Sequence, residues 1–189
     1  MTKSQTDVVR AALDILDERG AAAVSMRTIA ERLGVRMNTV LWHAKSKARL
    51  LELMADAIVA GASLDDLPAH WQERAVELIC RYRAALLAHR DGAAVVTGTY
   101  AAEPATLDFA EALVTAMLDG GHSDQQAAWA CWSLIYFTLG LTQEEQALSN
   151  RSTIELDVGR RPALKRVMPA LVDASFEQRF EFGVAKFLR

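Results

Sequence analysis

The chain of 189 residues has only two cysteines and four prolines, and no apolar run in it approaches the length of a membrane span. Cys80 and Cys131 lie in apolar helical stretches without the spacing of metal ligands, which indicates reduced thiols rather than a disulfide framework. The N-terminus lacks the apolar core of a signal peptide, so we expect a cytoplasmic protein that has no contact with a membrane.

An excess of positive charge is also missing, since 21 Lys and Arg stand against 24 Asp and Glu and give a net charge of −3. Taken alone, this balance argues against a nucleic-acid-binding protein. The charge is nevertheless uneven: residues 1–50 carry nine basic and five acidic side chains, whereas the remainder carries twelve and nineteen. A basic N-terminal segment on an acidic body is typical of a protein whose first part alone contacts phosphate.

Apolar residues recur with a helical period along the chain, and no segment alternates with the period of two that a strand requires. The pattern therefore predicts an all-α fold. Ser25 is a good N-cap for the second helix, and Gly34 ends it. The expected helices cover about 5–19, 25–33, 37–44, 46–60, 71–89, 93–98, 106–119, 125–146 and 173–188, with a polar loop over 149–162.

The segment from Thr28 to Val40 has the spacing of a helix-turn-helix. Two helices that cross over a tight turn need a small residue where their backbones touch, and Ala30 supplies it. The turn needs a residue that tolerates a left-handed backbone, and Gly34 follows four residues later. Val40 supplies the apolar contact from the second helix back to the first. Two packed helices that bind nothing would share this spacing, so the motif alone leaves both interpretations open.

The residues after the motif make the assignment specific. Residues 36–47 read RMNTVLWHAKSK, with an aromatic-rich end to one helix and a Lys that begins the next. Together, residues 28–51 resemble the N-terminal domain of the TetR family. Residues 82–99 (YRAALLAHRDGAAVVTGT) and 137–146 (FTLGLTQEEQ) are similar to the ligand-binding core of that family's tetracycline repressors. The resemblance implies a helix-turn-helix DNA-binding domain over residues 1–47 and a helical ligand-binding and dimerisation domain over residues 48–189.

The resemblance also implies that the second helix of the motif lies in the major groove of operator DNA. Arg suits guanine and Asn suits adenine, so Arg36 and Asn38 are expected near base edges. Leu41 stands where the family very often has Tyr, which removes one phosphate hydrogen bond. For Trp42, packing within the small domain is an equal alternative to DNA contact. The expected DNA-binding residues are Ser25 (chiefly a cap), Arg27, Arg36, Met37, Asn38, Thr39, Trp42, His43 and Lys47.

Two helices are candidates for a homodimer interface. Residues 127–141 form an apolar run that covers every side of a helix, which indicates burial on more than one side. The last helix carries a second apolar face, which consists of Phe176, Phe180, Val184 and Phe187. Such faces are more often ordinary core than interface, and the all-round apolar run is what favours dimerisation. Operators that are symmetric need two reading heads, so the expected function also requires two copies.

The resemblance implies a cavity in the body, with walls that suit a mid-sized, largely apolar effector. The expected ligand-binding residues are Tyr82, Val96, Thr99, Phe109, Cys131, Trp132 and Ile135, with Glu144 near the mouth. In the tetracycline repressors an imidazole holds the drug's magnesium ion, and the matching position here is Val96. An alkyl side chain cannot ligate a metal, so we expect neither a metal nor another cofactor.

The predicted function is therefore a ligand-responsive transcriptional repressor, which binds a palindromic operator as a homodimer and is released by a small effector. One alternative is a helical dimerisation or adaptor protein whose DNA binding has degenerated. The other is an enzyme. Against an enzyme, the sequence has no phosphate-binding glycine loop, no nucleophile elbow and no metal-spaced cluster.

Overall fold

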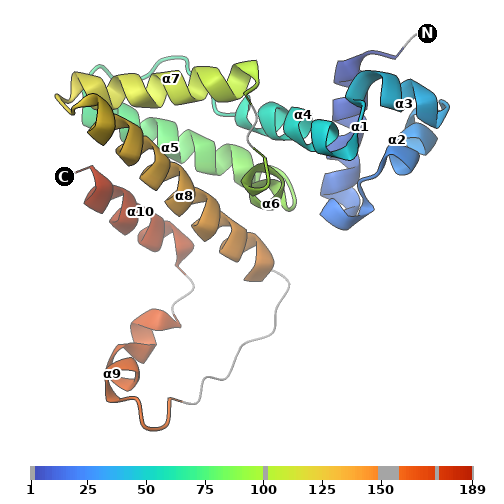
Figure 1. The fold of residues 1–189 in the computed structure, drawn as a ribbon. Helices are drawn as coiled ribbons and strands as arrows, with labels where there is room; N and C mark the ends of the chain where they lie inside the picture. Colours follow the sequence, from blue (N-terminus) through green and yellow to red (C-terminus); the bar gives the residue numbers. More distant parts are fainter. Residues whose placement is uncertain (1–2, 100–101, 149–157, 173–174, 189) are drawn as a thin grey trace.

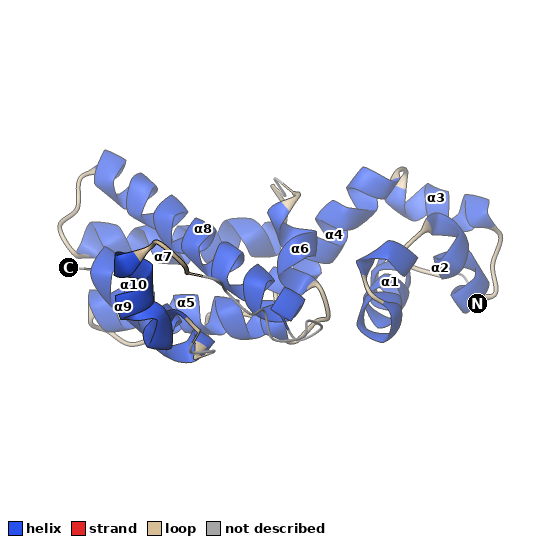
Figure 2. Cartoon of the chain, turned by 90° about the horizontal axis from the view of Figure 1, so that it is seen from below, coloured by secondary structure: helices blue, strands red, loops and turns tan. Residues whose placement is uncertain are grey.

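The computed structural model describes residues 3–99, 102–148, 158–172 and 175–188, and within these ranges every regular element is helical (Figures 1 and 2). This confirms the predicted all-α fold. None of the described helices combines the length and the apolar character needed to span a bilayer. The elements are α1 (Gln5–Arg19), the 3-10 turn η1 (Ala21–Ala23), α2 (Met26–Leu33), α3 (Met37–Ala44), α4 (Lys47–Val59), α5 (Trp71–Leu87), α6 (Gly92–Thr97), α7 (Pro104–Asp119), α8 (Asp124–Leu148), α9 (Pro162–Leu171) and α10 (Phe176–Phe187).

The first three helices form a small head at one end of the molecule (Figure 1). Ile29 and Val40 are fully buried where α2 and α3 face α1, and Ala30 is 5% exposed at the helix crossing. Gly34 ends α2 in the left-handed conformation, with φ 65° and ψ 35°. Ala30, Gly34 and Val40 thus have the roles that the sequence predicted, and the helix-turn-helix is confirmed as a structure.

The helix α4 joins the head to the body and packs against both (Figure 2). Its N-terminal part lies against α1 and α3, and its C-terminal part lies against α5, α6 and α7. The predicted domain boundary between residues 47 and 48 falls at the first residue of this helix.

The helix α9 was not predicted. The expected polar loop over 149–162 lies mostly outside the described residues, and its last residue, Pro162, begins α9. A proline at the first position of a helix and apolar residues at Leu164, Val167 and Leu171 were available as signals. Pro169 lies inside the helix and argues against it locally, because proline lacks the N–H for an intrahelical bond.

The last helix, α10, lies along α8 and closes the core of the body (Figure 1). Phe176, Phe180 and Val184 are at most 8% exposed within the single chain, and Phe180 stacks with Phe137 of α8 at 6.3 Å between ring centroids. The interpretation of this face as a contact with a second copy is therefore wrong, and the alternative of an ordinary core is confirmed. Phe187 alone of the four is exposed.

A buried ion pair fixes α10 on its neighbours. Arg83 of α5 is 8% exposed, and its guanidinium contacts Glu145 of α8 at 2.7 Å and Glu177 of α10 at 2.5 Å. The same group lies 5.0 Å from the ring centroid of Phe180. A buried guanidinium without partners would be costly, so the two carboxylates and the ring compensate the desolvation of Arg83.

We expect Gly92, the first residue of α6, to tolerate no side chain. A Cβ atom there would stand 2.3 Å from the carbonyl oxygen of Leu86, which is backbone and cannot rotate away. Gly92→Ala should therefore lower the free energy of unfolding by about 2 kcal/mol, or roughly 4–8 °C in melting temperature. Gly98→Ala is the matched control at the other end of α6, because a Cβ there meets nothing within 4 Å. Thermal unfolding followed by circular dichroism measures both; equal melting temperatures would contradict the prediction.

Candidate nucleic-acid interface and ligand pocket

The exposed face of α3 carries most of the side chains that were expected to contact DNA. Arg36 precedes the helix, and Met37 and Asn38 are exposed in its first turn. Trp42 follows one turn later and is 80% exposed. The alternative in which Trp42 packs within the small domain is therefore wrong. Thr39 and His43 are half-buried on the same helix.

On α2, the two expected residues differ in what they do. Ser25 caps the helix: its hydroxyl accepts the Thr28 backbone N–H at 3.1 Å, and its own N–H donates to the Thr28 hydroxyl at 3.0 Å. Arg27 is exposed and pairs with Glu31 one turn along α2 at 2.9 Å. An exposed pair of this kind contributes little to stability, so Arg27 can exchange its carboxylate for a phosphate at small cost.

The start of α4 concentrates features that favour an anion. Ser46 caps the helix by accepting the Arg49 N–H at 3.1 Å, while Lys47 is exposed in the first turn. A cation in the first turn opposes the helix dipole, whose positive end lies there. Lys47 is therefore poorly placed for the helix alone, but well placed for a phosphate that the free N–H groups also attract.

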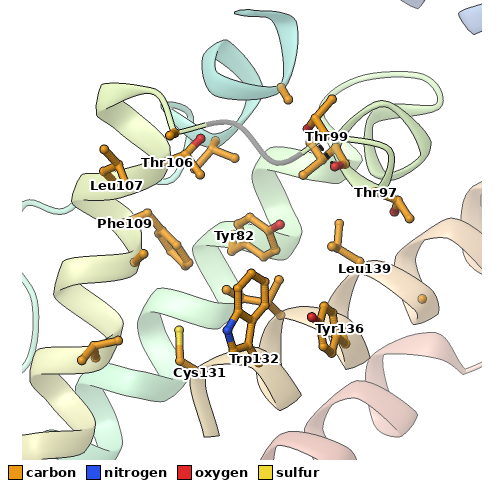
Figure 3. A pocket seen from close by; sticks show the side chains of 18 of the residues that line it. Tyr82, Thr97, Thr99, Thr106, Leu107, Phe109, Cys131, Trp132, Tyr136 and Leu139 are labelled. Carbon is orange, nitrogen blue, oxygen red and sulfur yellow. Dashed lines mark hydrogen bonds between the residues drawn. The ribbon is translucent and has the colours of Figure 1, made fainter. Parts of the chain in front are cut away.

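A cavity of about 540 Å³ lies in the body between α4, α5, α6, α7 and α8 (Figure 3). Seven of the expected ligand-binding residues line it, namely Tyr82, Val96, Thr99, Phe109, Cys131, Trp132 and Ile135. Glu144 does not line it and is exposed on α8. Several further lining residues were not predicted from the sequence, among them Ala55, Val59, Thr97, Thr106, Tyr136 and Gln143.

Aromatic rings form much of the wall. Tyr82 of α5 stacks on Phe109 of α7 with 4.9 Å between centroids, and Trp132 stacks on Tyr136 along α8 with 5.2 Å between centroids (Figure 3). Burial raises the pKa of the Tyr82 hydroxyl above its usual range and the pKa of the Cys131 thiol to about 11. Both groups are therefore neutral at physiological pH, and no charged side chain of the described residues lines the cavity.

Polar contacts connect the pocket wall to α4. Asp56 of α4 accepts both the backbone N–H of Thr106 at 2.8 Å and its hydroxyl at 2.9 Å, and Thr106 lines the cavity. About two turns earlier on α4, Arg49 makes a bidentate ion pair with Glu103, which precedes α7, and one of its two contacts measures 3.0 Å. The Arg49 guanidinium holds the pKa of Glu103 below its usual range. The start of α7 is thereby attached to the helix that bears Lys47.

A second set of contacts joins the turn between α5 and α6 to α1 and η1. Asp91 accepts the Ala21 N–H at 2.8 Å, and Asp17 accepts the Arg90 N–H at 3.1 Å. The imidazole of His89 lies 3.0 Å from Asp17. Since α6 carries Val96 and Thr97 on the pocket wall, hydrogen bonds connect the elements of the wall both to α4 and to the head.

Comparison with known proteins agrees with this arrangement. Residues 8–54 match the model of the bacterial regulatory proteins of the tetR family, and residues 65–188 match the tetracyclin repressor-like C-terminal domain. The chain is 34% identical to the tetracycline repressor protein class A from transposon 1721 of Escherichia coli, over 98% of this chain and 89% of that protein.

Two solved structures extend the similarity. A possible TetR family transcriptional regulator from Streptomyces coelicolor A3(2) is 36% identical, with a TM-score of 0.85 over 98% of this chain and 97% of that one. The structure of BioQ with its double-stranded DNA operator is 32% identical, with a TM-score of 0.70 over 92% of this chain and 98% of that one.

Proposed function

Because the chain belongs to the TetR family of bacterial regulatory proteins, we propose that it binds operator DNA as a homodimer and is released by a small effector held in the cavity. The observation that carries this proposal is the position of α4 between the DNA-binding surface and the cavity. Its first residue, Lys47, lies beside the recognition helix, and Ala55 and Val59 of the same helix line the cavity. One rigid element therefore reports the state of the pocket to the DNA-binding surface.

An effector that fills the cavity changes the contacts that hold α4. It displaces the wall formed by Thr106 and by α6, and both are hydrogen-bonded to elements outside the cavity: Thr106 to Asp56 of α4, and the start of α6 to η1 of the head. A ligand shifts a conformational equilibrium only by its differential affinity for the two states. Here the favoured state is the one whose cavity the effector fits, and its two heads no longer match the operator spacing.

A repressor of this kind needs a second copy, and exposed aromatic side chains supply a candidate interface. Trp129 and Tyr136 on α8 are 63% and 58% exposed, and Phe182 on α10 is 67% exposed. Trp129 and Tyr136 are seven residues apart and therefore share a face of α8. Exposed aromatic side chains are enriched at protein–protein contacts. Because a repressor acts on chromosomal DNA, the proposal also places the protein in the cytoplasm.

The test is DNA binding by the purified protein. A gel shift with the DNA upstream of its own gene should show a saturable complex that contains two protein copies, and footprinting should map it to a palindromic site. Affinity should fall steeply with salt, because phosphate contacts release counterions. Binding that is equally weak to every sequence would favour the alternative of a dimerisation protein with degenerate DNA binding.

We expect no magnesium-dependent binding of tetracycline, although tetracycline repressors are among the relatives. The position that resembles their metal-binding imidazole is Val96, which lines the cavity, and Glu144 is exposed outside it. No cluster of three or more possible metal ligands occurs among the described residues. Titration with tetracycline and magnesium should leave the fluorescence of Trp132 unchanged. The same titration should leave the operator complex intact. Tight binding that is lost on chelation of magnesium would contradict this prediction.

A further inference from the structure

Three threonines of the cavity already donate their hydroxyl protons in hydrogen bonds within the protein. The hydroxyls of Thr97 and Thr99 donate to backbone carbonyls of α6 at 2.7 and 2.9 Å, and that of Thr106 donates to the carboxylate of Asp56 at 2.9 Å. A hydroxyl has one proton and two acceptor lone pairs. Toward the cavity, these three side chains therefore offer lone pairs only, and a ligand that satisfies them must bring hydrogen-bond donors.

Tyr82 presents the opposite case. Its side chain is 3% exposed, and its hydroxyl makes no hydrogen bond with any of the described residues. Figure 3 shows it in the middle of the cavity, between Phe109 and Leu139. Burial raises its pKa, so the proton stays in place. The hydroxyl oxygen is open to the cavity rather than enclosed, so its proton is available to an acceptor on a ligand.

The rest of the wall excludes charge and favours flat rings. The described lining residues include no acidic, basic or imidazole side chain that would pair with an ionised ligand, and burying an unpaired charge is strongly unfavourable. The two stacked pairs, Tyr82 with Phe109 and Trp132 with Tyr136, present aromatic rings to the cavity. Such rings stack best on another flat aromatic system.

We propose that the effector is a neutral, flat aromatic molecule that carries an acceptor for Tyr82 and hydroxyl donors for the threonines. Hydroxylated aromatic ketones and quinones combine these features. The inference rests on the proposed function for the existence of an effector, while its chemical class follows from the hydrogen bonds of this cavity. A donor that reaches Thr106 also competes for the group that binds Asp56, which gives this class of ligand a direct effect on α4.

Three probes of similar shape test the proposal: 2,6-dihydroxyanthraquinone, 2,6-dimethoxyanthraquinone and anthraquinone-2-carboxylate. Calorimetric titration of the full chain at mildly acid pH keeps both hydroxyls of the first probe neutral. The dihydroxy probe should bind about tenfold more tightly than the dimethoxy probe, which has acceptors but no donors. The carboxylate should bind most weakly. Tyr82→Phe should weaken both neutral probes about fivefold, and Thr99→Val should reduce the difference between them.

Two results would overturn the inference: a carboxylate that binds as tightly as the dihydroxy probe, or no saturable binding by either neutral probe. Operator binding is measured on the same preparation without any probe. If the protein binds its operator and ignores the neutral probes, the ligand class is wrong and the proposed function stands. If it binds neither, the proposed function itself fails.

Discussion

Asn38→Ala should weaken binding to the specific operator on the order of 100-fold while leaving non-specific binding almost unchanged. Asn38 is exposed in the first turn of α3, the part of a recognition helix that reaches base edges. A bidentate side-chain contact with a base provides about 1–3 kcal/mol of discrimination. A homodimer makes that contact twice. A loss of about 1.5 kcal/mol in each half-site therefore adds up over the two half-sites to the expected 100-fold factor.

Lys47→Ala should weaken specific and non-specific binding together, because a phosphate contact carries no sequence information. The slope of log affinity against log salt should become shallower by about 0.9 for each phosphate contact, and therefore by about 1.8 for a dimer. Lys165→Ala is the matched control, since Lys165 is an exposed lysine on α9, outside both the head and the proposed dimer interface.

Fluorescence anisotropy with operator and scrambled duplexes over a range of salt concentrations separates the two effects. A Lys47→Ala protein with an unchanged salt slope would show that Lys47 does not contact phosphate. An Asn38→Ala protein that loses affinity equally for both duplexes would show that Asn38 positions the helix rather than reads a base.

The head could be predicted closely because its signals are local. Ser25 caps α2 through a hydrogen bond to a residue three positions away, and Gly34 ends the helix through its own backbone conformation. Neither requires knowledge of the rest of the fold. Local signals were misleading for α9, which was not predicted. Pro169 lies inside that helix, and a proline inside a helix is a strong local signal against it.

The pocket could be predicted only in part. Residues on α5, α6, α7 and α8 were found through their resemblance to a family core, whereas Ala55 and Val59 on α4 were not. Their role depends on how α4 crosses from head to body, which no local pattern contains. Glu144 illustrates a second limit. Its neighbour Gln143 lines the cavity, and one residue along a helix turns the side chain by about 100°.

Hydrophobic periodicity also identified the apolar face of α10 without identifying its partner. Phe180 and Val184 have the spacing of a helix face that packs on another element. The pattern does not tell whether that element is α8 or a helix of a second copy. Only the tertiary structure shows that α8 and Phe137 already cover it. An assembly prediction must therefore rest on side chains that the fold leaves exposed.

Trp129→Glu should convert the protein into a folded monomer that no longer binds its operator. Trp129 lies on α8 and is 63% exposed, so a charge there costs the single chain little. In a two-fold interface both copies carry the substitution. Loss of a buried tryptophan anchor typically costs at least about 2 kcal/mol, and twice that amount raises the dimer dissociation constant roughly 1000-fold. Operator affinity should fall with it, because a monomer has one reading head.

Leu64→Glu provides the matched control, since Leu64 is an apolar residue with 37% exposure in the segment between α4 and α5, outside α8 and α10. It should remain a dimer. Leu134→Glu tests the distinction between surface and core: Leu134 is fully buried in α8, so this variant should lose its helical circular dichroism rather than dissociate as a folded monomer. Sedimentation equilibrium measures the oligomeric state of all three variants, and circular dichroism measures their helix content. A Trp129→Glu protein that remains a dimer would show that the exposed face of α8 is not part of the interface. A wild-type monomer would contradict the proposed dimer with two reading heads.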